Sequence, residues 1–229
     1  MSPRSKARLA GAFYLLVFLT GALAAPGGRL IVPGDADATA TNILSHETLY
    51  LSGATGYILN VACYVVVTAL FFQLFKPAGR TLSLTAAFFS LVGCATQAVS
   101  CAFYIAPLIF LGGDRYLSTF SPAQLHAFAL VSIKLFSAGY DVGLAFFGFY
   151  CLLIGWLIVR STFVPRAIGV LMIFAGLGWL AFNAPVAASH LQPYIVLPGL
   201  IGELSLTLWL LLKGVDEPRW LAQAASKGA

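Results

Sequence analysis

The stretch that decides the class of this protein runs from Tyr140 to Arg160 and reads YDVGLAFFGFYCLLIGWLIVR. Between Asp141 and Arg160 it contains no charged residue. About twenty apolar residues in a row are enough for a helix to cross the hydrocarbon core of a bilayer. A carboxylate in such a segment costs roughly 2.5–3.5 kcal/mol at the helix centre on insertion scales, so it usually has a partner or a task. The stretch therefore predicts a membrane-spanning helix and makes Asp141 a candidate functional residue.

The composition of the whole chain agrees with this reading. Of the 229 residues, 60% are hydrophobic and only 9% are charged, whereas a soluble domain averages about 25% charged residues. The length suits one all-α, polytopic membrane domain over residues 1–229. The lipid bilayer is then the expected partner, and a multi-pass place in the cell membrane is the expected location. The net charge of +5 does not indicate nucleic acid, because the basic residues are spaced between apolar segments and form no patch.

Hydropathy divides the chain into six segments with the character of membrane spans. A short amphipathic helix near 35–47 is expected at the outer surface, and a further outer helix is expected at 122–137. Residues 122–160 contain no strong stop and would measure about 58 Å as a single helix. We therefore expect either a bend near Gly139 or a long protruding helix. The six predicted spans are residues 9–25, 48–75, 82–111, 140–160, 166–188 and 194–212.

The distribution of basic residues predicts the orientation. Cytoplasmic loops of membrane proteins carry an excess of Lys and Arg. Six spans place only Arg29, Arg115 and Lys134 on one side. Both termini are therefore predicted to be cytoplasmic. The ten basic residues on the other side are Arg4, Lys6, Arg8, Lys76, Arg80, Arg160, Arg166, Lys213, Arg219 and Lys227.

The first apolar segment has two readings. It could be a retained membrane helix or a signal peptide, because Ala22-Leu23-Ala24 resembles a small-residue cleavage site. Both readings place Pro26 outside the membrane, so the remaining topology is the same.

Motifs for metal, cofactor or enzyme chemistry are not found in the sequence. No C-x-x-C, H-x-x-x-H or H-E-x-x-H spacing is present, so no metal and no cofactor are expected. The G-x-S-x-G, Walker and dinucleotide-binding motifs are also missing. No catalytic residue is therefore assigned. The residue types that could bind a metal do not have the required spacing; they are Cys63, Cys94, Cys101, Cys151, His46, His126, His190, Glu47 and Asp114.

Several polar side chains interrupt the apolar segments at nearly the same predicted depth. Counted from the nearest cytoplasmic charge at about 1.5 Å per residue, Asn60, Gln97, Asp141 and Asn183 lie roughly 24–28 Å away. Glu203 lies about 15 Å from Lys213, near the midplane of the membrane. These side chains either join helices through mutual hydrogen bonds or line a polar cavity that opens outward, with Glu203 as its floor.

Lys134 is the first partner to consider for Asp141. It lies seven residues earlier on the same helix face, about 10 Å away if the helix is continuous. A direct ion pair would therefore need a bend at Gly139. The candidate ligand-binding residues are Asp141, Glu203, Asn60, Gln97, Asn183 and Lys134.

Four stretches resemble a family of bacterial membrane proteins catalogued as domain of unknown function 4386. They are LIVPGDA at residues 30–36, GYDVGL at 139–144, PRAIGVL at 165–171 and LPGLIGELS at 197–205. The resemblance extends from about Leu9 to Val215. It implies a six-helix bacterial membrane protein, to be found in the inner membrane, and it implies no known activity and no catalytic residue.

Three functional hypotheses follow. The leading one is a non-enzymatic integral membrane protein that binds a small amphiphile or lipid in an outward-facing polar pocket. The alternative is a small or proton-coupled transporter that uses Asp141 and Glu203. An intramembrane enzyme is third. Small residues on several helix faces suit either internal packing or a homo-oligomer, and the sequence leaves both open.

Overall fold

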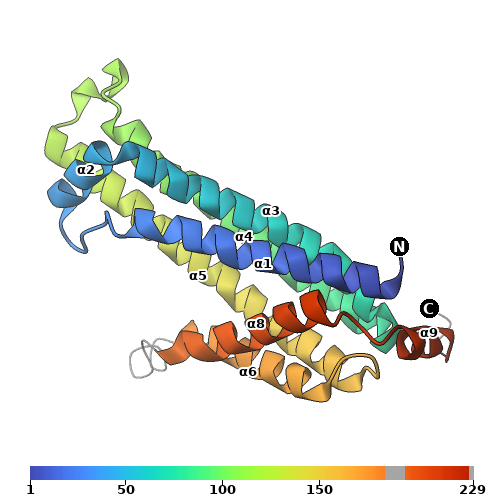
Figure 1. Cartoon of the computed structure of the whole chain (residues 1–229). Helices are drawn as coiled ribbons and strands as arrows, with labels where there is room; N and C mark the ends of the chain where they lie inside the picture. The colour runs from blue at the N-terminus through green and yellow to red at the C-terminus, as the bar shows by residue number, and fades with distance from the viewer. Residues whose placement is uncertain (184–193, 227–229) are drawn as a thin grey trace. The chain divides into compact units, whose positions relative to one another are not determined.

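The computed structural model describes residues 1–183 and 194–226 (Figure 1). Within these ranges the chain is helical and contains no strand, which confirms the predicted all-α class. Three short 3-10 helices, η1 (Lys76–Ala78), η2 (Arg115–Thr119) and η3 (Tyr194–Val196), connect longer elements. The α-helices are α1 (Pro3–Gly28), α2 (Ala36–Ser45), α3 (Glu47–Phe75), α4 (Arg80–Leu111), α5 (Pro122–Arg160), α6 (Arg166–Phe182), α8 (Leu197–Leu212) and α9 (Glu217–Ser226).

Four of the described helices are long and apolar enough to cross a membrane, namely α1, α3 with η1, α4 and α5. Helices α8 and α9 pass the same test only as a pair that is bent by 104°, which raises the number to five. Helix α6 is apolar but has 17 residues. Residues 184–188 of the predicted fifth span lie outside the described part of the chain. Length and composition therefore indicate a membrane protein, with four or five candidate spanning helices among the described residues.

Helix α5 differs from the expected division into an outer helix at 122–137 and a span at 140–160. It is one helix of 39 residues from Pro122 to Arg160, so the long-helix alternative is correct. Gly139 does not end it, because an interior glycine costs a helix only about 1 kcal/mol relative to alanine. Tertiary packing readily outweighs such a cost.

The short helix expected near 35–47 is present as α2, Ala36–Ser45. Asp35 caps it, since its side chain accepts a hydrogen bond from the Ala38 amide at 2.9 Å. Ala40 and Ile43 are fully buried, whereas Leu44 is exposed. The Nδ1 atom of His126 on α5 lies 2.6 Å from the Asp37 carboxylate. The contact between Asp37 and His126 therefore joins α2 to α5.

The chain forms two compact units, and each of the long helices α1, α3, α4 and α5 contributes one part to each unit. Unit 1 consists of Met1–Leu16, Cys63–Ala95 and Val142–Ala229, and unit 2 of Val17–Ala62 and Thr96–Asp141. All the described basic residues that were predicted on the cytoplasmic side belong to unit 1. Arg29, Arg115 and Lys134 belong to unit 2. The charge asymmetry of the sequence thus coincides with the division of the fold.

Close helix contacts organise unit 1. Helix α6 lies against α5 where glycines face each other: a Cβ atom added at Gly155 would lie 2.7 Å from the carbonyl oxygen of Gly169. Gly148 and Gly176 repeat this contact about two turns away. Small residues let membrane helices approach closely, and these glycines bring α5 and α6 into backbone contact. Helix α8 lies beside α6 (Figure 1).

Aromatic rings fill the core of unit 2. The rings of Tyr50 and Tyr104 are stacked with centroids 4.5 Å apart, and Tyr57 and Phe136 meet Tyr104 edge-on. The Tyr50 hydroxyl donates to the Tyr104 carbonyl oxygen at 2.5 Å. These contacts join α3, α4 and α5 within this unit.

Candidate functional site

Glu203 on α8 is 93% buried within unit 1, since only 7% of its surface is exposed. Its Oε2 atom accepts a hydrogen bond from the Tyr14 hydroxyl on α1 at 2.7 Å and a long one from the Tyr64 hydroxyl on α3 at 3.5 Å. Its Oε1 atom accepts from the Trp179 indole N–H on α6 at 2.5 Å. The Cys151 thiol on α5 lies 3.9 Å from the same atom. Four helices thus contribute donors to one carboxyl group on a fifth.

Gly199 makes room for the shortest of these contacts, the hydrogen bond from Trp179. It precedes Glu203 by four residues, so the two lie on the same face of α8. A Cβ atom at Gly199 would lie 2.5 Å from Cζ2 of the Trp179 ring. The indole can therefore come close to the backbone of α8 and direct its N–H to Glu203 because position 199 has no side chain. The sequence GLIGE at residues 199–203 thus supplies both the carboxyl group and the space for the indole that binds it.

Aromatic rings enclose the carboxyl group. The Tyr14 and Tyr64 hydroxyls are 3.3 Å apart, and their rings meet edge-on with centroids 5.6 Å apart. Phe71 packs edge-on against Tyr14, and Phe147 packs against Tyr64. Among the described residues no Lys, Arg or His forms an ion pair with Glu203. The carboxyl group is therefore surrounded by neutral donors.

The four donors were not among the residues predicted for the site. Tyr, Trp and Cys are ordinary members of apolar segments, so their type alone does not mark them. A depth count would have found three of them. Tyr64, Cys151 and Trp179 lie roughly 14–20 Å from the basic residue at the end of their helix, close to the 15 Å of Glu203.

Asn60 is a predicted site residue whose side chain forms hydrogen bonds with a neighbouring helix. Its Nδ2 atom donates to the Val17 carbonyl oxygen at 2.6 Å and lies 3.4 Å from the Thr20 hydroxyl. These contacts join α3 to α1 within unit 2 and favour a helix-joining role. Asn183 ends α6, is exposed, and donates to the Trp179 carbonyl oxygen at 3.3 Å.

The other predicted residues differ in their exposure. Gln97 is buried on α4, Asp141 is half-buried on α5, and Lys134 is exposed on the same helix. No ion pair joins Lys134 to Asp141 among the described residues, as expected for a helix that continues through Gly139. Asn60, Gln97, Lys134 and Asp141 belong to unit 2, whereas Asn183 and Glu203 belong to unit 1.

Comparison with known proteins gives one match. The model of a family described as "Domain of unknown function (DUF4386)" matches residues 9–214. The chain belongs to the DUF4386 family. No curated protein and no solved structure matches it. The range matched by the DUF4386 model includes Glu203 and its four donors and ends before α9.

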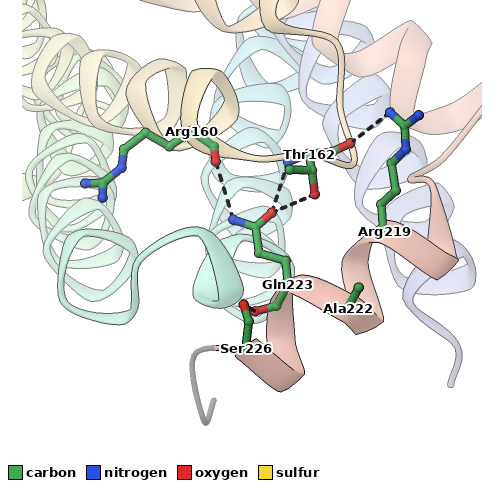
Figure 2. A pocket seen from close by; sticks show the side chains of 6 residues that line it. All are labelled: Arg160, Thr162, Arg219, Ala222, Gln223 and Ser226. Atoms are coloured by element: carbon green, nitrogen blue, oxygen red, sulfur yellow. Dashed lines mark hydrogen bonds between the residues drawn. The ribbon is translucent and has the colours of Figure 1, made fainter.

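Basic residues line several hollows in unit 1 of this DUF4386 protein. One hollow of about 740 Å³ lies between α9 and the turn that joins α5 to α6. Figure 2 shows the Arg160 guanidinium on one side of Gln223 and the Arg219 guanidinium on the other. Its lining residues are Arg160, Thr162, Arg219, Ala222, Gln223 and Ser226.

Gln223 joins α9 to the turn between α5 and α6. Its Oε1 atom accepts from the amide and the hydroxyl of Thr162, each at 3.0 Å, and its Nε2 atom donates to the Arg160 carbonyl oxygen at 3.4 Å. Arg219 donates to the Thr162 carbonyl oxygen at 3.4 Å. The predicted spans end at residue 212, and helix α9 itself was not predicted from the sequence.

Metal-type clusters are not seen in the described part of the chain. No three His, Cys, Asp or Glu side chains come together there as they would around an ion.

Proposed function

We propose that this DUF4386 protein is a small proton-linked membrane carrier in which Glu203 takes up and releases the coupled proton. The observation that carries this proposal is the enclosure of the Glu203 carboxyl group by donors from Tyr14, Tyr64, Trp179 and Cys151, with no cation paired to it in the described residues. Ionisable groups inside membrane segments commonly form proton pathways.

The surroundings of Glu203 suit both of its charge states. The ionised group accepts hydrogen bonds from neutral donors, and these offset part of the cost of burying a charge. The protonated group needs one acceptor for its own O–H. A tyrosine hydroxyl both donates and accepts, and Tyr14 and Tyr64 lie within 3.5 Å of Oε2. If one tyrosine hydroxyl rotates, it can accept a hydrogen bond from protonated Glu203 instead of donating one to the ionised group. The carboxyl group therefore has a hydrogen-bond partner in both charge states.

The membrane arrangement that we propose with this function has six crossings and both termini in the cytoplasm. Helices α1, α3, α4 and α5 supply four of them, and α6 and α8 would supply the other two. Helix α6 spans about 25 Å and α8 about 24 Å, which is short of a 30 Å core but usable with local thinning. The basic residues of unit 1 would then face the cytoplasm.

The geometry supports this function better than an outward pocket for an amphiphile. Asn60, one of the residues expected to line such a pocket, uses its side-chain amide within the helix bundle. The hollows described for unit 1 are lined by residues other than the six predicted ones. Asp141 remains a candidate second carboxyl group because it is half-buried on α5.

Infrared difference spectroscopy on protein in lipid vesicles, with labelled glutamate, tests the proton site. A carboxyl band should appear on moving from mildly alkaline to mildly acidic pH, and Glu203→Gln should remove it. Glu47→Gln is the matched control, because Glu47 is exposed in the first turn of α3. Charge movement after a pH jump on supported membranes should follow the same pattern.

Two results would overturn the proposal. A folded Glu203→Gln protein with unchanged charge movement would exclude Glu203 as the proton site. A Glu203 band that stays constant over the whole pH range would assign the residue a structural role. Tyr14→Phe, which keeps the ring, checks that the network rather than gross packing is being measured.

A further inference from the structure

We propose that an anionic phospholipid of the surrounding bilayer binds to unit 1. Its phosphate would occupy a hollow beside Arg4, Lys213 and Arg219, and one of its acyl chains would follow the groove between α6 and α8. This proposal is independent of Glu203 and of proton transfer. It also differs from the outward pocket expected from the sequence, since it uses the basic ends of the helices.

The polar part of the site is a hollow of about 680 Å³. Three cations line it, Arg4, Lys213 and Arg219, against one carboxylate, Asp216. Asp216 is already engaged, because its Oδ2 atom lies 3.4 Å from Nε of Arg219. The excess of positive charge suits a phosphate, which takes hydrogen bonds from Arg and Lys readily.

The turn after α8 brings these cations together. Gly214 adopts φ +72, the left-handed region that glycine enters without strain. A Cβ atom there would lie 3.0 Å from Cγ of Arg4. The chain therefore turns beside α1 immediately after Lys213, and Arg4 and Lys213 line the same hollow as a result.

The apolar part of the site is a groove of about 400 Å³. Ile168 and Leu171 of α6 and Leu208 and Leu212 of α8 line it. Leu208 and Leu212 are exposed in the protein alone. Such a groove is suited to an alkyl chain, which a soluble phosphate compound does not have.

The hollow and the groove are continuous at two residues. Trp209 and Lys213 line both of them. A cationic hollow that opens into an apolar groove has the polarity pattern of an amphiphile with a negative head. Basic pockets between membrane helices are a known mode of anionic headgroup recognition.

Helix α9 places this site at the level of lipid headgroups. It leaves α8 at an angle of 104° and buries none of its residues. Leu221 is exposed, and the Trp220 indole N–H donates to the Leu74 carbonyl oxygen at 2.8 Å. A helix of this kind lies in the plane of the interface when α8 crosses the membrane. The hollow in Figure 2 shares Thr162 and Arg219 with the proposed site.

The test uses purified, delipidated full-length protein in a neutral detergent. Phosphatidylglycerol should be retained in native mass spectra and should raise Tm, whereas phosphatidylcholine and glycerol phosphate should do neither. Arg4→Gln combined with Lys213→Gln should weaken phosphatidylglycerol binding by roughly tenfold or more, because each cation near the headgroup contributes to the attraction. Arg80→Gln is the control, since Arg80 is exposed and lines neither the hollow nor the groove.

A second variant tests the groove separately. Ser205 lines it, and Ser205→Phe should fill it and weaken binding while the cations stay in place. Equal retention of phosphatidylglycerol and phosphatidylcholine would overturn the proposal. Glycerol phosphate that competes as well as the lipid would show a soluble-anion site and would also overturn it. Unchanged binding in the double variant, with normal folding, would exclude the cations.

Discussion

Trp179 and Glu203 are joined by a hydrogen bond of 2.5 Å between the indole N–H and Oε1. This bond connects α6 to α8 at a buried position that lacks a cationic partner within the described residues. The indole therefore positions the carboxyl group, and as a donor it favours the ionised form of that group over the protonated one.

Trp179→Phe should report the charge state of Glu203. A hydrogen bond to an ionised group contributes about 1.5–3 kcal/mol, and one to a neutral group about 1 kcal/mol. The loss of stability in Trp179→Phe should therefore be larger where Glu203 is ionised and should shrink on acidification. Thermal unfolding in detergent at several pH values measures it.

Trp156→Phe is the matched control, because Trp156 on α5 is half exposed and should lose little stability at any pH. A pH-independent loss in Trp179→Phe would mean that Glu203 keeps one charge state throughout.

Gly199→Ala should disturb the same contact from the other side. The new Cβ atom would lie 2.5 Å from the Trp179 ring, so the indole must move away from Glu203. Overpacking of this kind costs about 1–3 kcal/mol. A lower Tm together with a changed Trp fluorescence spectrum would show both effects. Gly28→Ala should be tolerated, since nothing lies within 4 Å of its Cβ position.

Gly155→Leu should separate α5 from α6. Its Cβ position lies 2.7 Å from the Gly169 carbonyl oxygen and 2.8 Å from the Ile173 backbone nitrogen, and backbone cannot yield as a side chain does. We expect a loss of several kcal/mol or failure to fold, measured by Tm and by yield of monodisperse protein. Gly155→Ala should show a smaller loss in the same direction. Wild-type stability in both variants would contradict the packing of the two helices.

Asn60→Leu tests the helix-joining role of a residue that sequence analysis placed in a ligand pocket. Polar contacts between membrane helices contribute about 0.6 kcal/mol on average. Loss of the bonds to Val17 and Thr20 should therefore lower stability slightly and leave the pH-driven charge movement unchanged. A strong effect on charge movement with unchanged Tm would instead assign Asn60 a functional role.

The sequence predicted most helices of this protein because their signals are local. Long apolar runs specify α1, α3, α4 and α5, and Asp35 supplies the cap of α2. The polar helix α9 was missed because its apolar positions follow a helical period over only ten residues and form no apolar run. The continuity of α5 through Gly139 was one of two alternatives, and packing rather than propensity decides between them.

The surroundings of Glu203 were decided only by tertiary structure. Its predicted depth in the membrane follows from counting residues back from Lys213, and this depth made Glu203 a candidate site residue. Its partners come from α1, α3, α5 and α6, and Tyr14 lies 189 residues away in the chain. Helical periodicity shows which face of a helix a residue occupies but not which other helix that face meets. Close approach at glycines such as Gly155, Gly169 and Gly199 contributes to that choice, because the missing side chains let the backbones and the indole come near enough for the hydrogen bonds to form.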